Sequence, residues 1–142
     1  MTFDAHALAD DARCPCLSGE TYGACCGRFH RGEADAPTAE RLMRSRFSAF
    51  AVGDAAYLLA TWHPRSRPAH LELDPDLRWT RLDILRTTGG GMLSIDGTVE
   101  FRAHYRSGSR DGAAGSQHEV SRFVREGGRW FYVDAVASGG AS

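Results

Sequence analysis

Lysine is missing from this chain of 142 residues, whose 17 basic residues are all arginine and nearly balance 18 acidic residues, for a formal net charge of -1. A nearly neutral chain is a poor candidate for nonspecific binding to nucleic-acid phosphates, and we expect no direct sequence-specific contact with nucleic acid. No stretch approaches the roughly 20 apolar residues of a membrane span, and residues 1–11 hold no signal-peptide run. We therefore expect a cytoplasmic protein that does not enter a membrane.

Cysteine is absent outside one short segment, which holds all four: Cys14, Cys16, Cys25 and Cys26. Two close pairs separated by a loop let four thiolates converge on one ion, as in structural zinc sites. Disulfides would require cross-pairs, since adjacent cysteines bridge only with strain, and cross-disulfides and free thiols are the alternatives. Sulfur ligands also accept iron, so we expect zinc, with iron as the second candidate. His30 could replace one thiolate, although four cysteines already complete a tetrahedron.

The remaining sequence predicts two helices followed by antiparallel strands. Helical spacing of apolar residues runs from Thr38, a plausible N-cap, to Val52, and a shorter helix is expected over residues 55–62. Residues 27–37 are polar and are expected to form a linker. Strands are expected over residues 79–88, 92–95, 99–106, 116–126 and 129–136. This order predicts an α+β fold with helices packed on one face of a bent sheet.

The Gly127-Gly128 turn predicts the register of the last hairpin, because a two-residue turn determines which residues oppose each other. The expected pairs are Phe123 with Tyr132, Ser121 with Asp134, and Glu119 with Val136. One face would then be polar and aromatic. The other would be aliphatic, with Val120, Val124, Phe131 and Val133, and is a candidate homodimer interface.

Arg46 lies in the middle of the apolar stripe of the first helix, so its side chain is expected to point inward. A buried charge needs a partner, and Glu119 and Asp134 are the nearest candidates. One interpretation is a structural ion pair. The other is a ligand pocket, with these candidates: Arg46, Trp62, His63, Glu119, Ser121, Tyr132 and Asp134. His63 is more typical of a capping or packing residue than of a base, and no residue is assigned as catalytic.

Two segments resemble known families. CPCLSGETYGACCG at residues 14–27 resembles the SEC-C motif, the zinc-binding tail of the preprotein translocase motor. LMRSRFSAFAVGDAAYLLATWHP at 42–64 and SRFVREGGRWFYVDA at 121–135 resemble the uncharacterised bacterial YchJ family. The resemblance implies a metal-binding module at residues 1–31 and a nuclear-transport-factor-2-like domain at 37–138, a cone of helices over a curved sheet that commonly encloses a pocket.

The sequence departs from the SEC-C pattern behind the first cysteines, where Leu17 replaces a glycine and Glu20-Thr21 replaces lysines. The metal ligands carry over, and the basic partner-binding surface does not. Because a four-cysteine site has no open position for chemistry, the leading hypothesis is a non-enzymatic metal-binding protein whose module docks on a protein or the ribosome. The alternative is a small-molecule binder, or a hydrolase- or isomerase-like enzyme. In that case Arg46, Glu119 and Asp134 would resemble, in residue type, the aspartate-arginine-aspartate set of limonene epoxide hydrolases.

Overall fold

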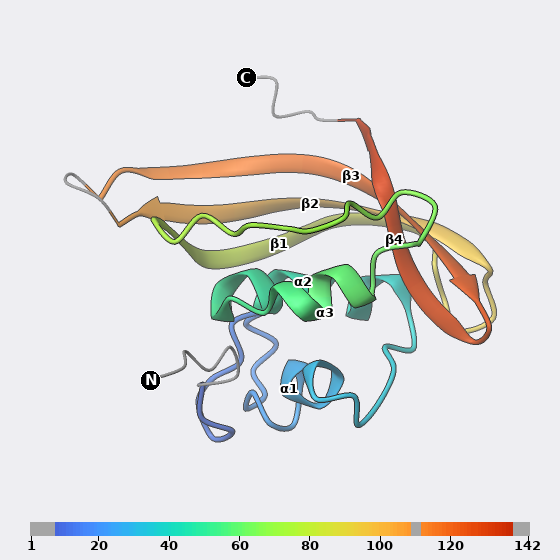
Figure 1. The fold of residues 1–142 in the computed structure, drawn as a ribbon, viewed down its shortest axis with the longest axis horizontal. Helices are drawn as coiled ribbons and strands as arrows, with labels where there is room; N and C mark the ends of the chain where they lie inside the picture. Colours follow the sequence, from blue (N-terminus) through green and yellow to red (C-terminus); the bar gives the residue numbers. More distant parts are fainter. Residues whose placement is uncertain (1–7, 109–111, 138–142) are drawn as a thin grey trace.

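A computed structural model describes residues 8–108 and 112–137 of the chain. The elements, in order, are α1 (Cys26–His30), α2 (Ala39–Val52), α3 (Ala55–Ala60), β1 (Leu77–Gly89), β2 (Asp96–Ser107), β3 (Ala114–Glu126) and β4 (Arg129–Ala137). Neighbouring strands pair antiparallel in the order β1-β2-β3-β4. Helices α2 and α3 cover one face of the curved sheet, and α1 with the N-terminal loop lies beyond them (Figure 1). The expected α+β architecture is confirmed.

The two predicted domains, 1–31 and 37–138, remain predictions as boundaries. Residues 1–7 of the first, and residues 109–111 and 138 of the second, lie outside the described residues. None of the helices in the described part of the chain is long and apolar enough to cross a membrane.

Helix α2 begins and ends where its local sequence predicts. The Thr38 side chain accepts a hydrogen bond from the backbone N–H of Arg41 at 3.1 Å, and Gly53 ends the helix in the left-handed region at φ 81°. Leu42 and Phe47 are almost fully buried against the sheet. The helix is therefore capped at both ends and attached to the core by its apolar stripe.

Helix α3 is shorter than expected, because it ends at Ala60 rather than at Trp62. Beyond its end the chain turns to run beside β4. The N–H of Tyr132 donates to the carbonyl of Thr61 at 2.8 Å, and the N–H of His63 donates to the carbonyl of Tyr132 at 2.7 Å. Long-range backbone pairing thus replaces the last helical turn.

Two other segments differ from the sequence prediction. Residues 92–95 form the connection between β1 and β2 rather than a strand. The predicted linker begins as helix α1, whose Phe29 is 4% exposed and packs in the main core. A helix of five residues is not stable by its own propensity, so burial of Phe29 and its neighbours supports it.

The register of the last hairpin was predicted correctly only near the turn. Phe123 pairs with Tyr132 as expected, and a bulge in β4 then shifts the ladder by one residue, so that Arg122 pairs with Asp134. The predicted pairing of Ser121 with Asp134 is therefore wrong. Since side chains alternate between faces, one extra residue moves Asp134 to the face opposite Ser121.

Candidate functional site

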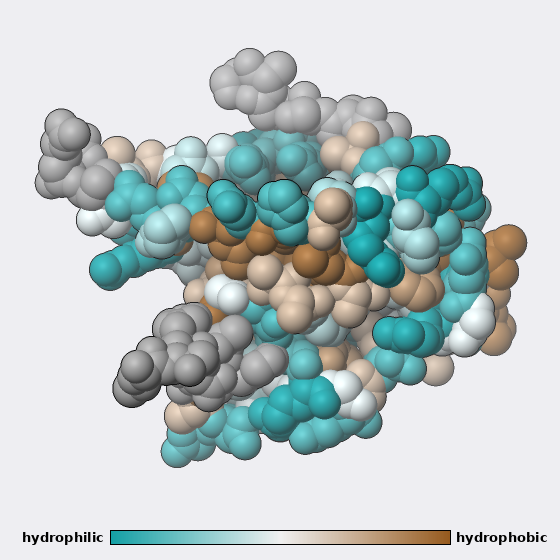
Figure 2. All heavy atoms as spheres, in the orientation of Figure 1, coloured by the Kyte–Doolittle hydropathy of each residue, from teal (hydrophilic) through white to brown (hydrophobic). Residues whose placement is uncertain are grey.

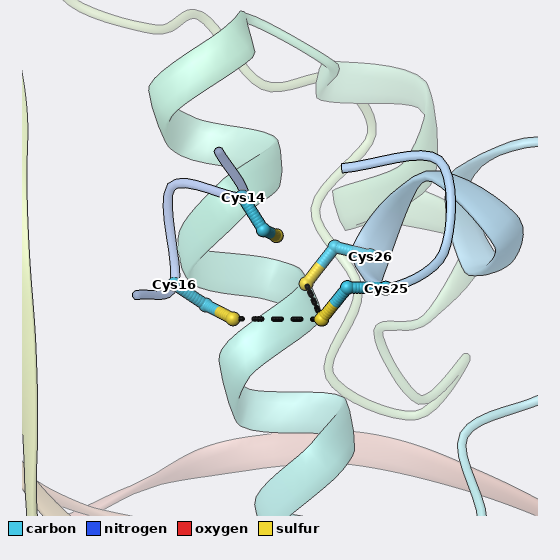
Figure 3. A group of neighbouring side chains, drawn as sticks. All are labelled: Cys14, Cys16, Cys25 and Cys26. Atoms are coloured by element: carbon cyan, nitrogen blue, oxygen red, sulfur yellow. Dashed lines mark hydrogen bonds between the residues drawn. The ribbon is translucent and has the colours of Figure 1, made fainter. Parts of the chain in front are cut away.

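The four cysteine sulfurs converge at one point between the N-terminal loop and the start of α1 (Figure 3). All four Sγ atoms lie within 4.8 Å of one another and are buried. The Cys16 to Cys25 separation is 3.7 Å and the Cys25 to Cys26 separation is 3.9 Å. A tetrahedron of sulfurs around zinc has edges of about 3.8 Å, given Zn to S bonds of about 2.3 Å. The cysteines are free thiols rather than disulfides, and their spacing fits a metal ion.

The electrostatics of the cluster also favour a cation. Hydrogen bonds from Cys16 and Cys26 lower the pKa of the Cys14 thiol. In turn, the hydrogen bond with Cys14 raises the pKa of the Cys16 thiol to about 11, and the hydrogen bond between Cys14 and Cys26 raises the pKa of the Cys26 thiol. One thiolate in this buried group therefore opposes ionisation of its neighbours. Four thiolates can coexist here only with positive charge among them.

Helix α2 anchors the cysteine segment to the rest of the protein. His30 uses both ring nitrogens: Nδ1 contacts the Tyr22 hydroxyl, and Nε2 lies 2.8 Å from the carbonyl oxygen of Ser45, to which it donates. The Ser48 hydroxyl lies 3.6 Å from the Cys14 sulfur. His30 is thus a buried bridge from α1 to α2, with neither nitrogen directed at the sulfurs as a replacement ligand.

Leu17 has a backbone conformation that favours glycine. Its φ is 60°, and among the non-glycine residues that the structure describes it alone has positive φ. Its N–H donates to the carbonyl of Cys14 at 2.9 Å, which closes the turn around the first two cysteines. The side chain is 44% exposed. The departure from the SEC-C pattern therefore puts a strained, exposed leucine on the loop that carries the cysteines.

Arg46 points inward as predicted, but it has no carboxylate partner within the described chain. It is 4% exposed, and its Nη1 donates to the carbonyl of Leu58 at 2.8 Å and to the Thr61 hydroxyl at 2.7 Å. The guanidinium also lies over the rings of Tyr132, at 4.4 Å, and Trp62, at 5.4 Å. The expected ion pair with Glu119 or Asp134 does not form. Burial lowers the pKa of Arg46 to about 10, which leaves it charged at neutral pH.

A cavity of about 290 Å³ lies between α2 and the sheet, next to Arg46. Its walls are mainly aromatic: Phe47, Phe50, Trp62, Trp79, Phe101 and Tyr132. Glu119 and Ser121 add polar groups, and burial raises the pKa of the Glu119 carboxyl. Hydrophobic residues form a band between the sheet and the helices on the face that Figure 2 shows. Five of the seven predicted pocket residues line this cavity: Arg46, Trp62, Glu119, Ser121 and Tyr132.

The other two predicted pocket residues lie elsewhere. Asp134 forms a two-point pair with the Arg122 guanidinium at 2.8 and 2.7 Å, and both side chains are about half exposed. His63 accepts from the N–H of Arg65 at its Nδ1, its Nε2 lies 3.0 Å from a Glu126 oxygen, and it borders a different cavity of about 350 Å³. The set of two carboxylates around Arg46 is therefore not assembled.

Sequence reasoning missed the residues that join the two parts of the molecule. Tyr22, Ser45 and Ser48 carry no recognisable motif, and His30 was considered only as a metal ligand. Thr61 was missed as a partner of Arg46, because it lies fifteen residues further along the chain. Ser45 and Ser48 are both fully buried, and this burial becomes visible only in the structure.

Comparison with protein families places this geometry in a known group. A family described as "YchJ, middle NTF2-like domain" matches residues 38–135, and the SEC-C motif matches residues 12–28. The chain belongs to the YchJ-like family. The YchJ-like match spans the cavity residues of α2 and the sheet, and the SEC-C match spans all four cysteines. The NTF2-like fold and the SEC-C motif expected from the sequence are both confirmed.

Relatives of this YchJ-like chain extend over most of its length. It is 59% identical over 121 residues to a UPF0225 protein of Streptomyces coelicolor, covering 85% of this chain and 92% of that one. A UPF0225 protein of Deinococcus radiodurans is 48% identical over 123 residues, with coverages of 87% and 88%.

Two solved structures share the fold. The solution structure of a SEC-C motif containing protein from Rhodopseudomonas palustris has a TM-score of 0.75 at 35% identity, covering 87% of this chain and 97% of that chain. The crystal structure of a SEC-C motif containing protein from Psychrobacter arcticus has a TM-score of 0.72 at 26% identity, with coverages of 95% and 88%. The combination of the cysteine module and the α+β domain is thus shared with these proteins.

Proposed function

We propose that the four cysteines hold one structural zinc ion and that the zinc-loaded segment is a docking module for another protein. The sulfur geometry carries this proposal, since separations of 3.7 and 3.9 Å match the edges expected of a zinc-sulfur tetrahedron. Four protein ligands leave no open coordination position, so the ion would organise the loop rather than activate a water. Cys14, Cys16, Cys25 and Cys26 would supply every ligand.

Zinc would stabilise a segment that has little apolar material of its own. The small cluster around the sulfurs includes the buried ring of Tyr22 and is completed by Leu8 and Val52 at its edges. Binding energy of a structural zinc ion contributes directly to folding when the site does not exist in the unfolded chain. The ion would therefore keep the loop in place on α2.

A protein fits the exposed side of the module better than ribosomal RNA does. Arg31 is already paired, at 2.8 Å from both Asp10 and Glu33, so its charge is largely neutralised. Leu17 is the exposed large apolar side chain of the loop. An apolar contact held in a rigid turn is suited to a protein surface, whereas RNA binding relies on free cationic groups.

Metal analysis tests the first half of the proposal. Protein purified without added metal should contain one equivalent of zinc by elemental mass spectrometry. The double variant Cys25→Ser, Cys26→Ser should hold less than about 0.2 equivalents, because it lacks two of the four ligands. Ser18→Ala is a matched control, because Ser18 contacts the Cys25 sulfur at 3.2 Å without being a ligand. Less than half an equivalent of zinc in the intact protein with its thiols reduced would overturn the zinc assignment.

Affinity capture tests the second half. Tagged wild-type protein, the double cysteine variant and Leu17→Ser should be compared by quantitative mass spectrometry, with zinc content measured on each. A protein partner captured by wild type and lost with both variants supports docking through the loop. Capture of the same partner by both variants would contradict docking through the loop. Salt-dependent co-sedimentation with ribosomes would instead favour the ribosome as the target.

A further inference from the structure

The guanidinium of Arg46 is an incompletely satisfied cation in an aromatic cavity. Within the described residues, only Nη1 makes hydrogen bonds, to the Leu58 carbonyl and the Thr61 hydroxyl. The N–H groups on Nε and Nη2 form no hydrogen bond within the described part of the chain, and no carboxylate there pairs with the guanidinium. Burying a cation in this way is costly unless something supplies the missing charge. The remaining donors of Arg46 can therefore bind an anionic group.

The surroundings of Arg46 specify the rest of a ligand. The rings of Tyr132 and Trp62 contact the guanidinium, and Phe47, Phe50 and Trp79 continue the aromatic wall. Aromatic surfaces of this kind stack with flat apolar groups. The volume of about 290 Å³ lies at the lower limit of the range of roughly 300 to 1,000 Å³ typical of small-molecule sites, which favours a ligand of one or two rings.

Glu119 limits how much negative charge the ligand can carry. Its carboxyl lines the same cavity and has no ion-pair partner among the described residues. A dianion such as a phosphate monoester would place a second charge in a small site that already holds this carboxyl. A single carboxylate can instead use the free donors of Arg46 and keep its ring at the aromatic wall.

We propose that the cavity between α2 and the sheet binds a small planar apolar molecule with one carboxylate, the carboxylate on Arg46 and the ring against Tyr132, Trp62 and Trp79. Arg46 is the anion-binding residue in this site, and the aromatic residues set the shape of the ligand. The cavity lies between α2 and the sheet, whereas the N-terminal segment that carries the cysteines lies on the side of α2 away from the sheet (Figure 1), so the two sites are separate. Occupancy of the cavity does not depend on whether the module docks on a protein.

Calorimetric titration of the full-length, metal-loaded protein tests the proposal with defined probes. Phenylacetate and indole-3-acetate should bind, whereas phenylacetamide, which keeps the ring and loses the charge, should bind at least about 20-fold more weakly, as expected for loss of a charge-assisted contact. Acetate and phenyl phosphate should also bind more weakly, because one lacks the ring and the other carries a second charge. Quenching of tryptophan fluorescence provides an independent readout, since Trp62 and Trp79 line the site.

Two arginine variants locate the binding site. Arg46→Met should weaken phenylacetate binding by at least about 20-fold. Arg44→Met is a matched change on the same helix, where the Arg44 side chain pairs with Glu40. It should change the affinity for phenylacetate less than about twofold. The proposal would be overturned if wild type bound phenylacetate and phenylacetamide equally well, or if Arg46→Met bound phenylacetate as well as wild type does. It would also be overturned if neither phenylacetate nor indole-3-acetate bound. The comparison of acid with amide uses wild type alone, so it remains decisive even if Arg46→Met does not fold.

Discussion

Replacing Arg46 by methionine separates the cost of burying a charge from the contacts that the charge makes. Burial lowers the pKa of Arg46 from its ordinary value to about 10, a shift equivalent to about 3 kcal/mol against the charged form. Methionine removes this cost and keeps most of the apolar stem, which packs next to Phe47 and Tyr132 in the cavity wall. The substitution therefore relieves a penalty as well as removing interactions.

The interactions lost are two hydrogen bonds and two ring contacts. Bonds from a charged donor to the Leu58 carbonyl and the Thr61 hydroxyl contribute about 1.5 kcal/mol each, and the contacts with the Tyr132 and Trp62 rings together add about 1 kcal/mol. Thr61 keeps a bond of its own, donating to the Tyr57 carbonyl at 2.8 Å. Set against about 3 kcal/mol of relief, the expected net loss is about 1 kcal/mol.

Urea unfolding followed by circular dichroism measures this value. Arg46→Met should lower the free energy of unfolding by about 1 kcal/mol with an unchanged slope, whereas Arg46→Ala should lose about 2 to 4 kcal/mol because it also leaves a void. The double variant with Glu119→Gln should be additive, since the two residues form no ion pair. A loss above about 3 kcal/mol for Arg46→Met, or a coupling above about 1 kcal/mol with Glu119, would refute the reasoning.

Three further changes test individual contacts. Leu17→Gly should raise the free energy of unfolding by about 0.5 to 1 kcal/mol, because relief of the left-handed φ of 60° exceeds the added chain entropy, and a loss in urea titration would contradict this. His30→Leu should lower the free energy of unfolding by about 2 to 3 kcal/mol, because it leaves the Tyr22 hydroxyl and the Ser45 carbonyl unpaired. It should also speed the reaction of the metal-free cysteines with a thiol reagent. Unchanged reaction rates would count against the bridge from α1 to α2. Glu119→Gln should raise the melting temperature at pH 7. Burial raises the pKa of Glu119 in the folded protein, so the stability that this carboxyl contributes is fully present below its ordinary pKa of 4.5 and is lost as the pH rises through its folded pKa. Glutamine stays neutral and does not incur this loss. The two proteins should melt alike at pH 4, and a difference that persists there would contradict the assignment.

Local features of the fold were predictable from the residues that form them. Thr38 and Gly53 mark the ends of α2, because a side-chain cap and a left-handed glycine act within one helical turn. The cysteine spacing indicated a metal site for a similar reason, since all four candidate ligands lie within thirteen residues. The inward position of Arg46 followed from helical periodicity alone.

Errors arose wherever a prediction extended a local rule over a distance. The Gly127-Gly128 turn determines pairing close to it, and the bulge in β4 shifts Asp134 away from Arg46 and toward Arg122. No turn rule could reveal this shift, because it depends on how the strand bends over the helices. Helix α1 was missed because burial of Phe29, rather than helix propensity, stabilises it.

The sequence by itself determined the grouping of the four cysteines, the caps of the main helix, the alternation of the strands and the burial of one arginine, because each depends on residues close together in the chain. The tertiary structure alone decided that Arg46 would meet aromatic rings and Thr61 instead of a carboxylate, and that His30 would join α1 to α2 instead of binding metal. These outcomes depend on contacts between distant segments, where a shift of one residue changes every partner.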